Sequence, residues 1–251
     1  MNRPMLSLLY FCYGLLVNIS LSTAVPVSRT IPQREKEPGY WHKLAKDELN
    51  IALGRKLNTN RAKNVILFVG DGMGVSTVTA ARIMKGQKEG RLGEETLLEF
   101  EKFPSVGMSK TYNVDHQVPD SAGTATAFLC GVKNNYGVVA LDGRVERGEC
   151  RNHKSKKATC IAELARKAGK RVGLVTTSRI THATPAPMFS ISPNRTWEND
   201  ALLPAEKVQD GCQDIASQMA TSGVDNLNVG QIIYIYIYHF SQIIFLHFVS
   251  T

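Results

Sequence analysis

The stretch Asn64–Gly74, with the sequence NVILFVGDGMG, sets the expected fold of this chain. Its apolar run ends at a glycine, which fits a strand that is buried on both faces, as in a parallel sheet. The residues that follow, Val75–Lys85, have the pattern of a helix. Strand, tight turn and helix in that order predict the first part of a β-α-β unit.

The same kind of pattern returns further along the chain. Lys156–Ala168 is amphipathic and is closed by Gly169, a natural helix stop, and Arg171–Thr177 is a second buried-strand candidate. A helix before a strand, with short loops, predicts an α/β fold. Upstream, Tyr40–Leu57 has helical periodicity, and the proline-bearing segment Pro26–Pro38 is expected to be extended.

Length and charge narrow the classes of protein to be considered. The 251 residues, 43% of them hydrophobic, suit one large domain or a piece of a larger one. The formal net charge of +8 is spread along the chain. Its densest basic run, Arg144–Lys157, has no interleaved aromatic residue, so we expect a solvated loop and no binding of nucleic acid.

The N-terminus has the pattern of a secretory signal. Arg3 supplies the positive start, Met5–Val17 is largely apolar, and Ser22–Ala24 offers small residues at the cleavage spacing. We therefore expect residues 1–24 to be a signal peptide that is removed after Ala24, which predicts a secreted or cell-surface protein.

Secretion makes the cysteines candidates for disulfides. Once Cys12 leaves with the signal, Cys130, Cys150, Cys160 and Cys212 remain, and they allow three complete pairings. Cys160 lies in a helical pattern and is interpreted as a core residue. Cys150 and Cys212 lie near polar, loop-like sequence and are the more plausible bridge.

The tail from about Ser222 differs in kind, because Gln231–Thr251 is rich in Ile, Tyr, Phe and His and contains no Lys, Arg, Asp or Glu. It could be a strand with both faces buried, a membrane helix interrupted by polar residues, or a lipid-anchor signal. A fourth interpretation, which we favour, is translation of an alternating A/T nucleotide repeat after read-through or mis-splicing. A spliced mature transcript that encodes these residues would contradict it.

The first predicted strand ends at an acid between glycines, Asp71 in Gly70–Gly74. Ligands of open α/β sheets bind outside the carboxyl ends of the strands. The spacing is neither the dinucleotide fingerprint nor a phosphate-binding P-loop. We therefore expect a metal site here rather than a flexible turn with an incidental acid.

A second motif is Pro119–Ala127, with the sequence PDSAGTATA. Small residues after Ser121 suit a nucleophile at the start of a helix, where free N–H groups and the helix dipole attract an anion. The alternative is an ordinary helix cap, since Asp120 and Ser121 are both good capping residues.

The second predicted strand leads into a third motif. His182 and Thr184 are two residues apart, so in extended backbone they would face one side, and a hydroxyl with a nearby imidazole suits Mg²⁺. A lone histidine is more often structural. Arg195 follows, and a guanidinium can hold two phosphate oxygens at once.

Together, Gly70–Gly74, Asp120–Ala127 and Thr181–Pro185 resemble the N-terminal motifs of the alkaline phosphatase family, and the resemblance covers about Trp41–Ala220. It implies a hydrolase of phosphate monoesters with two Zn²⁺ ions, one Mg²⁺ ion and a phosphoserine intermediate. It also implies a three-layer α/β sandwich around a largely parallel sheet, which we expect to be incomplete in this chain.

The resemblance implies a role for each matching residue. Ser121 would be the nucleophile and, when ionised, a zinc ligand, and Asp71 would bridge one zinc and the magnesium. Thr184 would bind the magnesium, with His182 behind it. Arg195 would clamp the transferring phosphoryl group.

By the same resemblance, Asp120 would orient Arg195, and a disulfide would join Cys150 to Cys212. The other metal ligands of the family come from a C-terminal half that this sequence does not match. We therefore expect residues 25–220 to be the N-terminal part of a catalytic domain, 221–251 to be an atypical apolar tail, and the chain to be inactive or weak. The alternative is a secreted fragment without catalysis that acts as a binding or decoy protein.

Related hydrolases fit less well. Cys130-Gly131-Val132 lacks the Cys-x-Pro-x-Arg pattern of sulfatases, and phosphodiesterase relatives tend to use Thr where this chain has Ser121. The family is usually dimeric, but we expect much of that surface to be missing here. The resemblance implies membrane attachment only through a lipid anchor of the full-length family. Asn194 begins a glycosylation sequon, which we expect to be unused because a glycan would obstruct Arg195.

Overall fold

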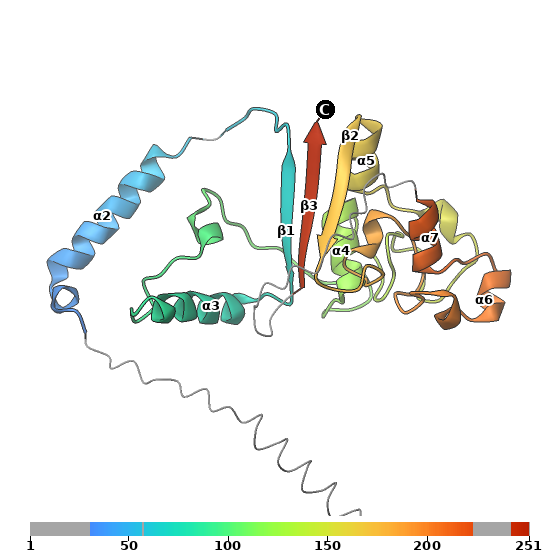
Figure 1. The fold of residues 1–251 in the computed structure, drawn as a ribbon, viewed down its shortest axis with the longest axis horizontal. Helices are drawn as coiled ribbons and strands as arrows, with labels where there is room; N and C mark the ends of the chain where they lie inside the picture. Colours follow the sequence, from blue (N-terminus) through green and yellow to red (C-terminus); the bar gives the residue numbers. More distant parts are fainter. Residues whose placement is uncertain (1–30, 57, 223–241, 251) are drawn as a thin grey trace, which may run out of the picture. The chain divides into compact units, whose positions relative to one another are not determined.

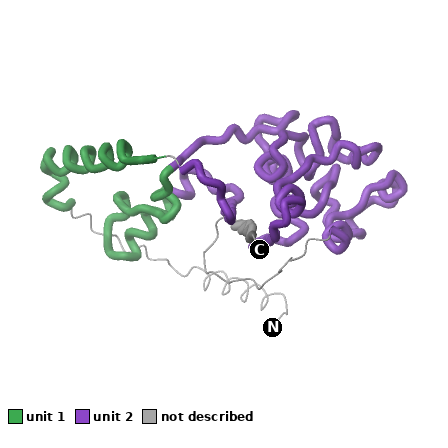
Figure 2. Tube along the Cα trace, turned by 90° about the horizontal axis from the view of Figure 1, so that it is seen from above, with its two compact units in different colours: residues 1–56, 79–104 green, residues 57–78, 105–251 purple. Residues whose placement is uncertain are grey.

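The computed structural model describes residues 31–56 and 58–222, and the backbone of residues 242–250. The chain divides into two compact units, residues 1–56 with 79–104, and residues 57–78 with 105–251 (Figure 2). The predicted signal peptide, at residues 1–24, and most of the predicted tail segment lie outside the described residues. The domain boundaries expected from the sequence stay predictions.

The first unit is helical in its described part. It holds the short 3-10 helix η1 (Gln33–Lys36), helix α2 (Pro38–Gly54), most of α3 (Val75–Lys88) and the 3-10 helix η2 (Glu99–Lys102). The two helices predicted near Tyr40 and Val75 are thus confirmed. Pro38 begins α2, a position where its missing N–H breaks no intrahelical hydrogen bond.

The expectation of an extended segment before Pro38 is wrong at η1. There the Glu35 N–H donates to the Pro32 carbonyl (3.0 Å) and the Glu37 N–H donates to the Arg34 carbonyl (3.2 Å). A proline fixes only its own backbone and restrains the residue before it, so the residues after Pro32 are free to close a turn.

The second unit contains a sheet of three described strands, β1 (Val65–Asp71), β2 (Lys170–Thr176) and β3 (Gln242–Ser250), in the order β1-β3-β2 (Figure 1). Both predicted strands are confirmed, and β3 lies within the tail. Both of its pairings are antiparallel, with Asp71 opposite Gln242 and Thr176 opposite Ile244.

The α/β class is confirmed, but the expected parallel sheet is wrong for the described strands. β1 and β2 run in the same direction without being neighbours, because β3 lies between them and pairs with the backbone of both. Each strand edge presents N–H and C=O groups that need partners, and an antiparallel strand supplies them as well as a parallel one. Sequence alone does not say which strand fills that position.

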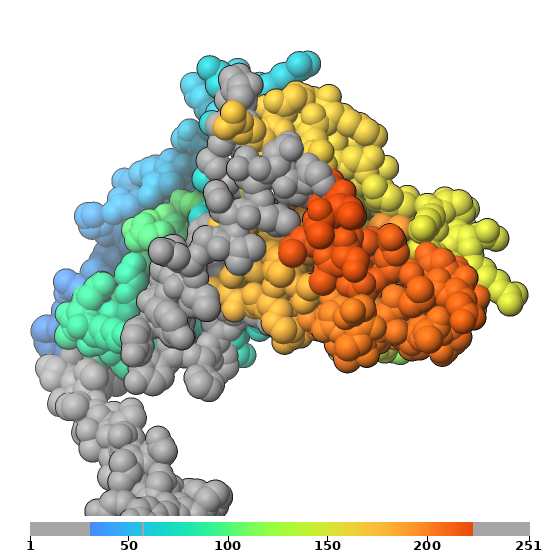
Figure 3. Space-filling model, turned by 45° about the vertical axis from the view of Figure 1, so that its right-hand side comes forward, coloured from blue at the N-terminus to red at the C-terminus, as the bar shows by residue number. Residues whose placement is uncertain are grey.

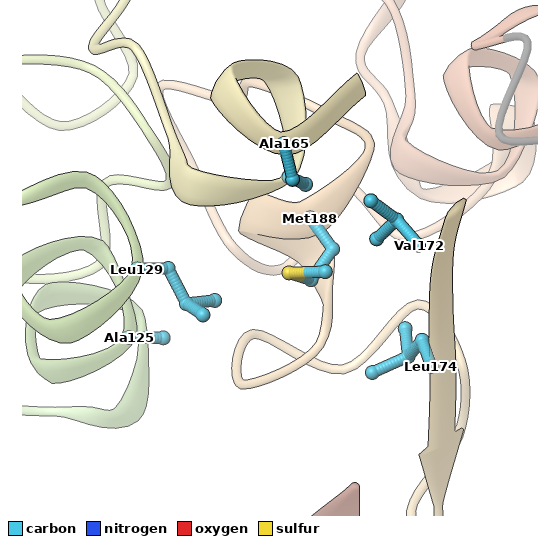
Figure 4. Close-up of a cluster of buried hydrophobic side chains, with 7 residues drawn as sticks. Ala125, Leu129, Ala165, Val172, Leu174 and Met188 are labelled. Atoms are coloured by element: carbon cyan, nitrogen blue, oxygen red, sulfur yellow. The ribbon is translucent and has the colours of Figure 1, made fainter. Parts of the chain in front are cut away.

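One face of this sheet carries the main core of the second unit. Helices α4 (Ser121–Cys130) and α5 (Ile161–Lys167) and the 3-10 helix η4 (Ala186–Met188) contribute to a buried cluster with residues of β1 and β2. Figure 4 shows the Met188 side chain among those of Leu129, Ala165, Val172 and Leu174. This packing holds the helix that begins at Ser121 against the two strands.

The other face of β1 is open to solvent in the described structure. Ile66 is 54% exposed and Phe68 is 59% exposed, whereas Leu67 and Val69 pack toward the core. The prediction that this strand is buried on both faces is therefore wrong here, because α4 and α5 pack against the side chains of one face. The three-layer sandwich stays a prediction.

Helix α5 is shorter than predicted and begins after a disulfide. Residues 153–156 form the separate 3-10 helix η3 (His153–Lys156), Cys160 is the N-cap of α5, and Gly169 follows the helix with a φ of 72°. Cys160 is buried, as expected, but it is also bridged to Cys130 at the end of α4. A helical pattern could not reveal that these two helix ends meet.

The Cys150–Cys212 bridge expected from the sequence is confirmed. It links the loop before η3 to the region of α6 (Ala205–Gln209) and α7 (Ile215–Thr221). Figure 3 shows the orange surface of this region beside the yellow surface that precedes β2. Within the described residues, no helix is both long and apolar enough to cross a bilayer.

Candidate active site

Helix α4 begins with Asp120 as its N-cap and Ser121 as its first residue. The Gly123 N–H donates to Asp120 Oδ1 at 3.1 Å, which closes the first turn. Of the two capping candidates in the sequence, Asp120 therefore caps the helix. The Ser121 hydroxyl is not needed for capping and makes a contact outside the helix.

Three chain segments meet at one carboxylate oxygen. Ser121 Oγ donates to Asp71 Oδ2 at 2.8 Å, and Thr184 Oγ1 donates to the same oxygen at 2.9 Å. Asp71 is the last residue of β1, so the strand delivers its carboxylate to the start of α4. The structure thus brings together three of the site residues predicted from the sequence.

The other predicted pair lies beside this group. Arg195 Nη1 donates to Asp120 Oδ2 at 2.9 Å, while Asp120 Oδ1 also accepts the Gly137 N–H at 3.1 Å. The Asp120 side chain is only 4% exposed and that of Arg195 is 24% exposed. The contact implied by the family resemblance is present, and its role in phosphate binding stays a proposal.

His182 connects Arg195 to Thr184. Arg195 Nη2 lies 3.1 Å from His182 Nε2, and Thr184 Oγ1 lies 3.2 Å from His182 Nδ1. Because a guanidinium can only donate, Nε2 accepts this hydrogen bond, and the Thr184 N–H also lies 3.3 Å from His182 Nδ1. Burial lowers the pKa of His182, and the Arg195 cation lowers it further, which favours the neutral ring.

The prediction that extended backbone places His182 and Thr184 on one side is wrong, although their side chains do meet. The backbone at these residues is not extended, since the His182 N–H donates to the Arg179 carbonyl and the Ala186 N–H donates to the His182 carbonyl. Successive turns after β2 place the two side chains together. Spacing of two residues predicts a shared side only in a strand.

These groups line a cavity of about 1010 Å³ that lies within the second unit. Its lining includes Asp71, Ser121, Thr184 and Arg195, and also Tyr136. A cavity of this size accommodates a small organic ligand. Hydroxyl, carboxylate and guanidinium groups at one end of it suit an anion that is approached by a nucleophile.

The donor set at this end fits a hard cation. One carboxylate and two hydroxyls, from Asp71, Ser121 and Thr184, are oxygen ligands of the kind that Mg²⁺ binds. Zinc sites usually combine nitrogen, sulfur and carboxylate ligands. In the part of the chain that the structure describes, no cluster of three or more His, Cys, Asp and Glu side chains could hold a metal.

Sequence reasoning missed Glu198 and its partners. Glu198 accepts hydrogen bonds from Arg179 Nε (2.9 Å) and Nη2 (2.7 Å) and from Thr181 Oγ1 (2.6 Å). These bonds, that from Arg179 above all, lower the pKa of Glu198 from 4.5 to about 2. The sequence did show an acid, Glu198, shortly after Arg195 and a cation, Arg179, shortly before His182, which is the pattern that could have indicated this ion pair.

The low pKa of Glu198 predicts a loss of stability in acid. A carboxyl whose pKa is lower in the folded state stabilises that state above its unfolded pKa, and this contribution disappears as pH falls from about 4.5 to about 2. We expect the urea midpoint of the wild type to fall more steeply over this range than that of a Glu198→Gln variant. Equal slopes would contradict the prediction.

Asn194 is expected to carry no glycan. Its Oδ1 accepts hydrogen bonds from Thr196 (N–H 3.1 Å, Oγ1 3.0 Å) and from Arg147 (3.3 Å), and the next residue is Arg195 of the cavity. A glycan would crowd this end of the cavity. Peptide mass spectrometry of the protein from a secreting eukaryotic host should find Asn194 unmodified, and a glycopeptide there would contradict this.

Comparison with known proteins gives one consistent match. The profile of the alkaline phosphatase family matches residues 62–230. The tissue-nonspecific alkaline phosphatase of Gallus gallus is 54% identical over 198 residues, which cover 78% of this chain and 37% of that protein. The Homo sapiens isozyme is 54% identical over 190 residues, covering 75% and 36%.

Solved structures also align with part of this chain. The alkaline phosphatase of the Antarctic bacterium TAB5 aligns with a TM-score of 0.44 and 27% identity, over 62% of this chain and 36% of that one. The chain thus spans little more than a third of the length of the curated relatives cited above.

Proposed function

Because the chain belongs to the alkaline phosphatase family, we propose that its second unit carries the nucleophile and the phosphate-binding residues of a phosphate monoester hydrolase. The observation that supports this most directly is the placement of Ser121. Its hydroxyl lies at the start of α4, bonded to Asp71, in a cavity that Arg195 also lines.

In the proposed reaction, the phosphoryl group passes to Ser121 and then to water. A bond forms between Ser121 Oγ and phosphorus as the ester bond breaks and the alcohol leaves. Water then attacks the phosphoserine, which releases inorganic phosphate and restores the hydroxyl. The hydrogen bond to Asp71 orients Oγ before attack, because it fixes where the hydroxyl proton points.

Arg195 is proposed to bind two oxygens of the phosphoryl group. The guanidinium presents a planar fork of N–H groups that matches such oxygens. Asp120 holds it from the buried side through Nη1 and so pre-orients the fork. The positive end of the α4 dipole favours the same dianion, and it does so near Ser121.

We propose that Asp71 and Thr184 would hold Mg²⁺, with His182 behind Thr184. The resemblance implies that Asp71 and Ser121 would also hold Zn²⁺. Divalent cations in such a site stabilise charge on phosphoryl oxygens and lower the pKa of a hydroxyl nucleophile. Because no cluster of three or more His, Cys, Asp and Glu side chains among the described residues could hold a metal, we expect the 251-residue chain alone to turn over weakly.

The proposed setting is a secreted or cell-surface protein that acts on phosphate monoesters. This follows the family and the predicted signal at residues 1–24. The two disulfides support it, since such bonds persist in oxidising compartments. Dimerisation and a lipid anchor stay predictions.

The test is an assay of the 251-residue chain with a phosphate monoester, Zn²⁺ and Mg²⁺. We expect release of inorganic phosphate, even if slow, and a phosphoryl adduct on the peptide that contains Ser121 after acid quenching. A phosphoryl adduct on another residue would contradict the proposal. If the chain shows no turnover and forms no adduct, the result would favour the alternative of a secreted binding or decoy protein.

A further inference from the structure

Glu198 lies three residues after Arg195 and accepts hydrogen bonds from the turn that leads into His182 and Thr184. We propose that it is a positioning residue, which holds the turn bearing His182 and Thr184 in place relative to Arg195. The inference rests on the proposed function, because it concerns the binding of the cation and of the phosphoryl group at that site.

On one side, Glu198 holds the beginning of the turn. Its carboxylate accepts two hydrogen bonds from Arg179 and one from Thr181. The backbone of Arg179 is in turn bonded to His182, whose N–H donates to the Arg179 carbonyl at 3.0 Å. Glu198 therefore contacts the residues that immediately precede His182 and that set its direction.

On the other side, Glu198 is fixed to a buried part of the second unit. Its carbonyl accepts the Ala216 N–H at 3.0 Å, and the carbonyl of Trp197 accepts the Ile215 N–H at 3.0 Å. Trp197 is 5% exposed and Ile215 is fully buried. The segment that follows Arg195 is thus anchored to α7 and provides a firm support.

The two segments touch again inside the site, where Arg195 Nη2 meets His182 Nε2 at 3.1 Å. His182 in turn contacts Thr184, and the Thr184 hydroxyl donates to Asp71. If the hydrogen bonds from Arg179 and Thr181 to Glu198 are lost, the turn can move away from Arg195. The distance between the Thr184 hydroxyl, which would bind the cation, and the Arg195 guanidinium, which would bind phosphate, would then no longer be fixed.

If Glu198 and Arg179 formed only an exposed ion pair, removing it would have little effect on ligand binding, because exposed ion pairs contribute little free energy. Arg179 is indeed 67% exposed. The Glu198 side chain, however, is only 17% exposed and accepts a third hydrogen bond from the neutral hydroxyl of Thr181. The two interpretations make different predictions for ligand binding, which allows a test.

The experiment compares Glu198→Gln with Glu163→Gln in the 251-residue chain. Glu163 is a matched control, since it accepts Lys157 and Lys167, each at 2.8 Å, and has its pKa lowered to about 2, but it lies on α5 and does not line the site cavity. Titration calorimetry would measure the binding of Mg²⁺ alone and of inorganic phosphate in the presence of Mg²⁺.

We expect Glu198→Gln to weaken both bindings by roughly tenfold, the effect typical of removing a residue that orients metal ligands. Glu163→Gln should leave both within about twofold of wild type, at the level of an exposed ion pair. Thr181→Val, which removes one hydrogen bond only, should give an intermediate loss. This variant also serves if Glu198→Gln does not fold, as judged by thermal unfolding.

Unchanged binding in Glu198→Gln or Thr181→Val, or equal losses in the Glu163→Gln control, would overturn the inference. Its failure can be told apart from failure of the proposed function. A wild type that binds Mg²⁺ and phosphate but never forms phosphoserine contradicts the proposed function alone. A wild type that binds neither ligand contradicts both.

Discussion

Replacing Ser121 with Ala is expected to abolish the phosphoryl adduct and to lower phosphate release by at least about a thousandfold relative to wild type. The reason is that the substitution removes the only hydroxyl that is bonded to Asp71 at the start of α4 among the described residues. The fold should persist, because Asp120 rather than Ser121 caps the helix. Circular dichroism and the urea midpoint would verify this.

Thr124→Ala is the matched control for this change. Thr124 lies in the same helix and lines the same cavity, but its hydroxyl donates to the Asp120 carbonyl at 3.1 Å. Its loss should leave the adduct on Ser121 in place. An adduct that survives in Ser121→Ala, or a loss of similar size in Thr124→Ala, would show that Ser121 is not the nucleophile.

Replacing Asp120 with Ala is expected to lower the free energy of unfolding by about 3 kcal/mol, the sum of a lost helix cap and an unpaired, partly buried cation. Asp120 accepts the Gly123 and Gly137 N–H groups and binds Arg195. The ion pair's share, about 2 kcal/mol, is set below the roughly 3–5 kcal/mol of a fully buried pair, because Arg195 retains 24% exposure and can regain some water. Urea unfolding of the oxidised protein measures it.

Asp214→Ala separates the two contributions. Asp214 is a buried N-cap of α7 that accepts the N–H and the hydroxyl of Ser217, at 2.8 and 2.5 Å, so its loss reports the cost of a cap without an ion pair, about 1 kcal/mol. The Asp120 variant should exceed it by about 2 kcal/mol and should also weaken phosphate binding, because Arg195 loses its orientation. Equal losses would mean that the Asp120–Arg195 pair does not stabilise the fold.

Local patterns carried much of the prediction. The apolar run before Asp71 predicted β1, and helical periodicity predicted α2, α3 and the core of α5, because each depends on residues that are close in sequence. The small residues after Asp120 predicted where a helix starts. The Cys150–Cys212 bridge followed from loop-like surroundings and from the family resemblance.

Errors arose where a local pattern has several tertiary outcomes. An apolar strand can be buried on one face or on both, and β1 exposes Ile66 and Phe68. A buried cysteine in a helical pattern can be a core residue or half of a bridge, and Cys160 is both. Each outcome depends on which element packs alongside, and neighbouring residues in the sequence do not encode this.

The sequence by itself determined the family, the order of the main elements and the residue types available at the candidate site. Only the tertiary structure decided that Ser121 and Thr184, which are 50 and 113 positions from Asp71, share one of its oxygens, and that Glu198 brackets the turn beside them. The physical reason is that backbone propensity and side-chain periodicity act over a few residues. A hydrogen bond between distant segments exists only after the packing of α4, α5 and the strands has brought those segments within about 3 Å of each other.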